Sequence, residues 1–208
     1  LTLEGNSILY VIENINVIAL VGVKDIIRDD AKDIISELSK DKEVIMLTGD
    51  NKVTAGVIAK ELNINNVISN VLPSEKVKEI KKLMKDKTVM MIGDGINDAP
   101  SLATSNIGVS IGSGTDIAND SSDVILMNDN LVNIVNLINI SKKTMKIIKE
   151  NLFWAFFYNI CMIPIAIGLF NNFGINMNPM IAGLSMTLSS VTVILNTLRL
   201  KKIKVRKC

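Results

Sequence analysis

The chain has 208 residues, of which 48% are hydrophobic, and its mean hydropathy of +0.35 is high for a purely soluble protein. It contains no histidine, which excludes a histidine base and any histidine-ligated metal site. The two cysteines, Cys161 and Cys208, lack Cys-x-x-Cys spacing, which argues against a disulfide framework and against a zinc ribbon.

The net charge of +2 conceals an uneven distribution along the chain. Residues 1–140 carry a balance of −7, whereas residues 141–208 carry +9 with a single acidic residue, Glu150. The first part predicts an acidic soluble domain, and the second has the charge pattern of membrane-helix flanks. The basic residues border long apolar runs rather than an aromatic-rich face, so we expect no nucleic-acid partner.

Short apolar runs alternate with helical patterns through the first part of the chain. The first two runs, at 8–12 and 17–23, predict a hairpin or two sequential strands. Next come a helix, a strand, a helix, a short strand and a helix, predicted at 28–39, 44–47, 54–62, 67–68 and 75–85. A strand, a short helix and two further strands then follow at 89–92, 99–104, 107–111 and 124–127. This alternation predicts an α/β fold with a parallel sheet covered on both faces, whose ligands bind at the carboxyl ends of the strands.

The last part of the chain has the sequence pattern of a membrane-spanning region. A long helix is predicted over 131–150, and two uncharged stretches follow at 152–170 and 179–198, joined by a polar turn at 171–178. About 20 residues span the bilayer core as a helix. Two buried core helices are the alternative, but lysines and arginines flank the pair while its connecting loop is uncharged. We therefore expect a transmembrane hairpin in the plasma membrane, with the soluble domain and the C-terminus cytoplasmic.

Two polar turns follow predicted strands and would share one edge of the sheet. Thr48-Gly49-Asp50 follows the strand at 44–47, and Gly-Asp-Gly-Ile-Asn-Asp-Ala-Pro at 93–100 follows the strand at 89–92. Asp94 is a suitable oxygen ligand for Mg²⁺, and Asp98 lies in the same turn. Thr48 can donate a hydrogen bond to a phosphoryl group, and Lys76 can neutralise its charge. Singly each could be a surface residue, but together they predict a phosphoryl-transfer site.

Polar side chains also occur within both apolar stretches. Tyr158 and Asn159 lie in the first, and Met186 and Ser190 lie four residues apart in the second. Polar groups at membrane depth usually face a bundle interior or a transport path, and a thioether is a soft ligand for Cu(I). From the residues alone, ordinary packing remains the stronger interpretation, because serines join membrane helices and methionine fills apolar gaps.

Three segments resemble the phosphorylation-domain signatures of P-type ATPases, which have a haloacid-dehalogenase-like fold. They are Met46–Asn51, Leu72–Lys76 and Gly93–Pro100. The resemblance implies that 1–20 is the tail of a nucleotide-binding domain, 21–140 the phosphorylation domain and 141–208 the last two transmembrane helices with a basic tail. It also implies use of ATP and Mg²⁺, with Mg²⁺ held by Asp94 and Asp98. The catalytic roles that it implies fall on Thr48, Gly49, Asp50, Lys76, Asp94, Asn97 and Asp98.

The Tyr-Asn pair and the Met-x-x-Ser-Ser segment are similar to signatures of the copper(I) branch of these heavy-metal pumps. The resemblance therefore implies a transported Cu(I) ion bound partly by Tyr158, Asn159, Met186 and Ser190. Zinc, cadmium and cobalt branches carry Lys, Asp, His or Glu in these helices, and none of these occurs between residues 152 and 198. Copper export as the direction of transport follows from the resemblance and not from these residues.

The chain lacks other parts of such a pump. The Asp-Lys-Thr-Gly-Thr segment with the phosphorylated aspartate, the actuator Thr-Gly-Glu loop, the Cys-Pro-Cys motif and most of the ATP-binding domain are absent. We therefore expect this chain to be inactive alone and to depend on the actuator, the nucleotide-binding domain and the other membrane helices of the same ATPase. One alternative is a membrane-anchored phosphatase of the haloacid-dehalogenase type with Asp25 as nucleophile. Another is a non-catalytic membrane remnant.

Overall fold

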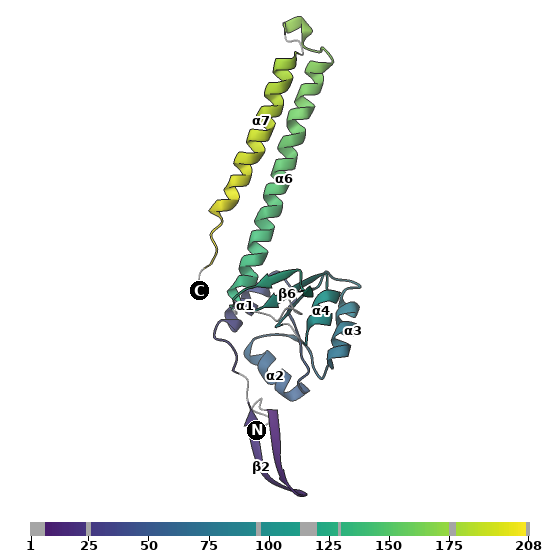
Figure 1. Cartoon of the computed structure of the whole chain (residues 1–208), viewed down its shortest axis with the longest axis vertical. Helices are drawn as coiled ribbons and strands as arrows, with labels where there is room; N and C mark the ends of the chain where they lie inside the picture. Colours follow the sequence, from purple (N-terminus) through teal and green to yellow (C-terminus); the bar gives the residue numbers. More distant parts are fainter. Residues whose placement is uncertain are drawn as a thin grey trace. The chain divides into compact units, whose positions relative to one another are not determined.

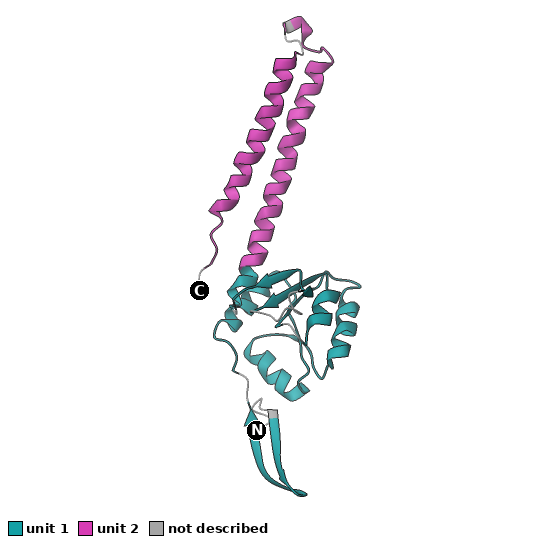
Figure 2. Cartoon of the chain, in the orientation of Figure 1, with its two compact units in different colours: residues 1–135, 208 teal, residues 136–207 magenta. Residues whose placement is uncertain are grey.

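The computed structural model describes residues 7–23, 26–94, 97–112, 120–128, 130–174 and 178–206. The chain forms two compact units, one of residues 1–135 with 208 and the other of residues 136–207 (Figure 2). The expected domain limits at residues 20 and 140 stay predictions, because compactness does not identify the domains of a longer protein.

The first unit begins with an antiparallel hairpin of β1 (Ser7–Glu13) and β2 (Asn16–Val23), as the sequence predicts. Asn14 makes the turn with a φ of 56°, a left-handed conformation that asparagine tolerates better than most residues. Every residue of β2 is exposed, and large apolar side chains such as Leu9 and Tyr10 are about 60% exposed. Two strands alone are marginally stable in water, and among the described residues β1 and β2 pair only with each other.

Strands and helices then alternate along the rest of the first unit (Figure 1). In chain order they are α1 (Ala31–Leu38), β3 (Ile45–Leu47), α2 (Lys52–Glu61), β4 (Asn66–Ile68), α3 (Pro73–Leu83), β5 (Met90–Gly93), α4 (Ala99–Thr104), β6 (Ile107–Ile111) and β7 (Val124–Leu126). β3 pairs in parallel with β4, and β6 lies between β5 and β7 in a second parallel group. The predicted parallel α/β arrangement is confirmed, as two hydrogen-bonded groups among the described residues.

The core of this unit forms around β6 and the two helices that precede it. Val109 of β6, Leu102 of α4 and Ile80 of α3 are at most 1% exposed. The spacing of apolar residues at 75–85 predicts that Val77, Ile80, Leu83 and Met84 face inward. Of these four, Ile80 is buried, while Val77, Leu83 and Met84 remain partly exposed. Burial of Leu102 beside β6 holds the short helix α4 directly after the turn that contains Asp94 and Asp98.

The second unit consists of two long helices side by side (Figure 1). α6 (Val132–Ala166) is one 35-residue helix, so the predicted helix at 131–150 and the apolar stretch at 152–170 are continuous. No proline or glycine interrupts the chain near 150, whereas Pro164 and Gly168, with a φ of 80°, bring the helix to its end. η2 (Asn171–Phe173), α7 (Pro179–Thr197) and η3 (Leu198–Lys202) follow.

One helical segment in the described part of the chain, Pro179–Lys202, is long and apolar enough to cross a membrane. None of its apolar window is buried within the structure, which distinguishes it from the core helix of a soluble protein. The second crossing, expected from 152–170, remains a prediction.

Candidate functional site

The Thr48-Gly49-Asp50 loop follows β3 and is held by its own side chains. The Thr48 hydroxyl donates to Asp50 Oδ2 at 2.7 Å, and the backbone N–H of Asp50 donates back to Thr48 Oγ1 at 3.1 Å. Gly49 is exposed at the tip. The hydroxyl proton of Thr48 is therefore already directed at Asp50, and it would have to turn away from Asp50 to serve a phosphoryl oxygen.

Backbone hydrogen bonds tie this loop to the segment that leads into α3. The N–H of Val71 donates to the carbonyl of Thr48 at 3.2 Å, and the N–H of Asn70 donates to the carbonyl of Asp50 at 2.8 Å. Asn70 has a φ of 57°, which turns the chain at this point. The Thr48 loop and the start of the helix that carries Lys76 consequently have a defined relative position.

Lys76 and Asp98 form the central ion pair of the site, with Nζ and Oδ1 2.8 Å apart. Their side chains are only 16% and 14% exposed, so solvent screens this pair less than a surface ion pair. Lys76 comes from the second turn of α3 and Asp98 immediately precedes α4, whose first amides donate to the Asp98 carbonyl. The packing of α3 on α4 thus joins two motifs that lie 22 residues apart.

Gly93, the last residue of β5, leaves the space that Asp98 occupies. A Cβ at position 93 would lie 2.9 Å from both Cβ and Oδ2 of Asp98, closer than side-chain contacts allow. The turn at 93–100 therefore requires glycine at position 93, because Asp98 packs closely against it. The sequence also predicts that Gly93 and Gly95 let the backbone approach a ligand closely, but Gly95 lies outside the described residues.

Asp94 and Asn97 are exposed at the end of β5, and no protein hydrogen bond or ion pair of their side chains is seen among the described residues. Mg²⁺ characteristically takes one or two carboxylates and completes its shell with water and substrate phosphate. An open carboxylate at a strand end fits that requirement. Asp94 would be the direct ligand, while the Oδ1 of Asp98 is already engaged by Lys76.

The expected copper residues lie on both long helices, with Tyr158 and Asn159 on α6 and Met186 and Ser190 on α7. Tyr158 reaches across to α7, where its hydroxyl lies 3.1 Å from that of Thr192. Asn159 donates to the carbonyl of Ala155 at 3.0 Å, and Ser190 donates to that of Met186 at 3.1 Å. No hydrogen bond joins Tyr158 or Asn159 to the side chains of Met186 and Ser190 in this described part of the chain, and a copper site built from the four groups stays a prediction.

Three polar contacts between these helices were not predicted from the sequence. Thr192 is the partner of Tyr158, and Asn151 accepts a hydrogen bond from Asn196 at 2.9 Å while donating one to Thr197 at 2.9 Å. Uncharged polar residues within an apolar run are the only signal for such contacts, and that signal does not say which residues pair. The pairing depends on the rotation of each helix about its axis.

Comparison with known proteins accounts for both units. A family model described as haloacid dehalogenase-like hydrolase matches residues 1–106. Proteins named copper-exporting P-type ATPases are similar over most of the chain. The protein from Bacillus subtilis is 46% identical over 203 residues, and a probable one from Archaeoglobus fulgidus is 43% identical over 200 residues. These matches cover 97% and 95% of the chain but 25% of each relative, so the chain spans about a quarter of their length.

Solved structures agree with this relationship. A zinc-transporting PIB-type ATPase in its E2·Pi state has a TM-score of 0.79 and 33% identity, covering 95% of this chain and 32% of that one. The catalytic domain of the CPx-ATPase CopB-B has a TM-score of 0.50 and 36% identity, over 57% of this chain and 47% of that one. The chain belongs to the haloacid dehalogenase-like hydrolase family, within which it is similar to heavy-metal P-type ATPases over nearly its whole length.

Proposed function

We propose that this chain is part of an ATP-driven copper(I)-exporting P-type ATPase. The observation that carries the proposal is the 43–46% identity to proteins named copper exporters over 95–97% of the chain. The structural neighbour that transports zinc is 33% identical, which favours copper as the cargo. The acidic first unit and the apolar helix Pro179–Lys202 agree with a cytoplasmic catalytic part joined to a membrane part.

In this proposal the first unit supports phosphoryl transfer to an aspartate that lies outside this chain. Lys76 places its ammonium beside Asp98 at the site and is the group that would neutralise phosphoryl charge. Thr48 would donate its hydroxyl after leaving Asp50, and Asp50, Gly49 and Asn97 would shape the surrounding loops. Bound at Asp94, Mg²⁺ would offset the negative charge of the phosphoryl oxygens.

The second unit would supply part of the copper path. Met186 is 72% exposed and offers a thioether, the type of ligand that suits Cu(I). Asn159 and Ser190 are also exposed on the helix pair. Exposed groups of this kind need further helices to complete a coordination shell, which agrees with dependence on the remaining membrane helices of the same ATPase. The plasma membrane, two crossings and a cytoplasmic C-terminus complete the proposal.

Metal-stimulated ATP hydrolysis by the full-length protein in vesicles tests the assignment. We expect stimulation by Cu(I) and none by Zn²⁺. Met186→Ala should remove the stimulation, whereas Met180→Ala should retain it, because Met180 is a similarly exposed methionine in the first turn of α7. Stimulation by Zn²⁺ alone would overturn the copper assignment, and equal behaviour of the two variants would remove Met186 from the path.

A haloacid-dehalogenase-type phosphatase is the second candidate, favoured by the hydrolase family model over residues 1–106. Its nucleophile would be Asp25, which lies outside the described residues. Hydrolysis of a phosphate ester in the presence of Mg²⁺ and without Cu(I), lost in Asp25→Asn and retained in Met186→Ala, would establish it. A protein that inserts stably in membranes with neither activity would instead be the non-catalytic remnant.

A further inference from the structure

A small basic crevice lies between α6 and the 3₁₀ turn η3, and neither phosphoryl transfer nor the proposed copper path uses it. Its volume is about 240 Å³, and its lining residues are Lys143, Lys146, Ile147, Glu150, Arg199, Lys202 and Ile203. Arg199 is paired with Glu150 at 2.8 Å. Lys143, Lys146 and Lys202 have no acceptor among the described residues, so three ammonium groups surround the crevice without a counter-charge.

Hydrogen bonds at both ends of η3 hold the walls of this crevice. At the start of η3, Arg199 Nη1 donates to Glu150 on α6 and to Asn196 at 2.7 Å. Beyond its end, the side chain of Asn136 both donates to the carbonyl of Arg206 at 3.0 Å and accepts its N–H at 2.9 Å. Asn136 is only 6% exposed. The segment that carries Lys202 and Ile203 is therefore fastened to α6 on both sides, and the crevice is preformed.

The crevice lies at the depth of the lipid headgroups if α7 crosses the bilayer as proposed above. The 20 residues from Pro179 to Leu198 correspond to about 30 Å of helix, the thickness of the hydrocarbon core. Arg199 and Lys202 follow at once. On α6, Trp154 is one turn beyond Glu150 and packs edge to face on Phe153, with ring centroids 5.5 Å apart. Such aromatic groups are typical of the membrane interface.

The size and the lining residues of the crevice indicate which class of ligand it binds. Its volume is below the range of about 300–1,000 Å³ that is usual for pockets of drug-sized molecules. Buried Ile147 and partly exposed Ile203 form an apolar floor beneath the ammonium groups. We propose that the crevice binds one anionic phospholipid, with its phosphate among Lys143, Lys146 and Lys202 and its glycerol backbone against the two isoleucines. This proposal rests on the membrane placement in the proposed function and is independent of which metal is carried.

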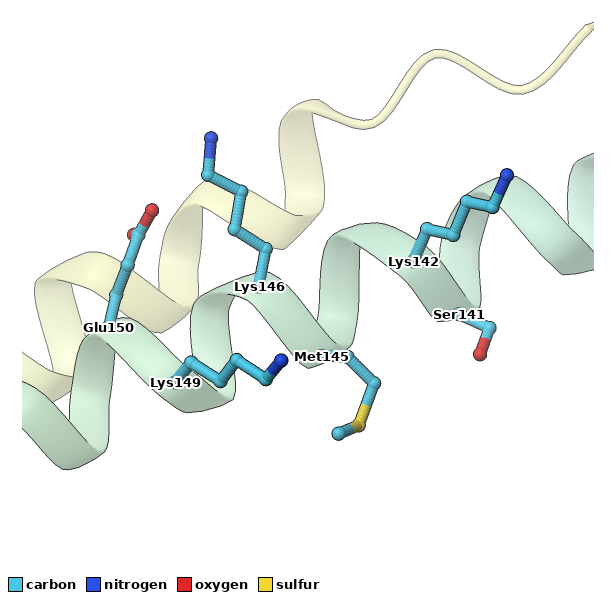
Figure 3. Close-up of a pocket in the computed structure, with 6 residues that line it drawn as sticks. All are labelled: Ser141, Lys142, Met145, Lys146, Lys149 and Glu150. Atoms are coloured by element: carbon cyan, nitrogen blue, oxygen red, sulfur yellow. The ribbon is translucent and has the colours of Figure 1, made fainter.

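The same helix provides a matched control. Lys149 does not line the crevice, and Figure 3 shows it on the side of α6 that carries Met145, whereas Lys146 and Glu150 extend from the other side. Lys201 and Lys204 are exposed near η3 and are likewise absent from the crevice. Replacing Lys149, Lys201 and Lys204 removes the same charge from the same flanks.

Native mass spectrometry of the delipidated full-length protein tests the proposal. The probes are phosphatidylglycerol, phosphatidylcholine and inorganic phosphate. We expect one phosphatidylglycerol per protein, held about tenfold more tightly than phosphatidylcholine and not displaced by millimolar phosphate. K143Q/K146Q/K202Q should weaken this binding about tenfold or more, since each lysine near an anionic lipid surface contributes about 1 kcal/mol. K149Q/K201Q/K204Q should change it by less than about twofold, and K143R/K146R/K202R should retain it.

Equal binding of the two lipids would overturn the proposal. So would equal losses in the two glutamine variants, which would indicate a diffuse basic surface, or displacement by free phosphate. Carbonate extraction of the same protein from its membranes distinguishes an error in the membrane placement from an error in the lipid site. Release by carbonate would overturn the membrane placement as well, whereas retention together with a lack of lipid preference would overturn the lipid site alone.

Discussion

The two units differ in how completely each satisfies its own functional groups. In the first unit, Lys76 is paired with Asp98, and Thr48 is hydrogen-bonded to Asp50, all through contacts within the unit. In the helix pair, Met186 is 72% exposed, and Asn159 and Ser190 bond only to backbone carbonyls one turn away in their own helices. The residues proposed to support catalysis thus contact one another within this chain, whereas the proposed metal ligands would need other helices to complete a site.

If the helix pair lies in a membrane as proposed, the different solvents of the two units explain the difference. A water-soluble α/β unit must bury its apolar groups on itself, and in doing so α3 and α4 bring Lys76 to Asp98. Membrane helices have no such drive to bury apolar surface, because lipid chains are as apolar as leucine. The polar groups of such helices therefore determine with which further helices they pack. Variants that change one unit at a time test whether the two units differ in this way.

The largest effect is expected when the ion pair of the first unit loses its cation. Lys76→Met leaves the Asp98 carboxylate largely buried without a partner and removes the cation that faces the phosphoryl group. We expect ATP hydrolysis by the full-length protein to fall about 100-fold or more. Lys82→Met on the same helix is the control, because Lys82 is 65% exposed and pairs with Glu79 on the solvent side. Similar losses in both variants would show that α3 acts only as a structural element.

A smaller effect is expected from overpacking the support of the site. A Cβ at Gly108 would lie 2.7 Å from the backbone carbonyl oxygen of Leu102, which cannot move without shifting α4. We expect Gly108→Ala to lower the stability of this unit by about 1–3 kcal/mol, measured by amide hydrogen exchange in β6. Gly56→Ala should instead stabilise it by about 0.4–1 kcal/mol, because its Cβ would contact nothing within 4 Å in the middle of α2.

In the second unit, Asn136→Ala tests whether a local polar contact holds the C-terminal segment. Loss of its two hydrogen bonds to Arg206 should cost about 1–2 kcal/mol locally, seen as about tenfold or faster exchange of the Arg206 amide. Asn139→Ala, one turn further along α6 and exposed, should leave that exchange unchanged. Unaltered exchange in Asn136→Ala would mean that other contacts hold the segment.

The smallest effect has the opposite sign. Ser101 is 1% exposed, and its hydroxyl has no hydrogen-bond partner among the described residues. Ser101→Ala should raise the stability of the first unit by about 0.5–1 kcal/mol, measured by hydrogen exchange in β6. Ser105→Ala should lower it, since the Ser105 hydroxyl donates to the carbonyl of Leu102 at 2.8 Å. A loss of stability in Ser101→Ala would show that this hydroxyl has a partner after all.

Patterns local in the chain allowed much of the fold to be predicted. Apolar runs indicated each strand of the first unit, and the short helix expected near 99–104 is α4, Ala99–Thr104. Continuity was harder to judge, because the sequence around Glu150 changes from charged to apolar without a helix-breaking residue. The division expected there does not occur in α6. A change of polarity marks a change of solvent and not the end of a helix.

The amino-acid sequence by itself determined the parallel α/β class, the two turns with Thr48 and Asp94, the apolar helix Pro179–Lys202 and the basic flanks, since these depend on neighbouring residues. Only the tertiary structure decided which side chains meet. Lys76 meets Asp98 across 22 positions, Tyr158 meets Thr192 across 34, and Asn136 meets Arg206 across 70. Such pairings depend on how helices pack and rotate against one another, and no local periodicity carries that information.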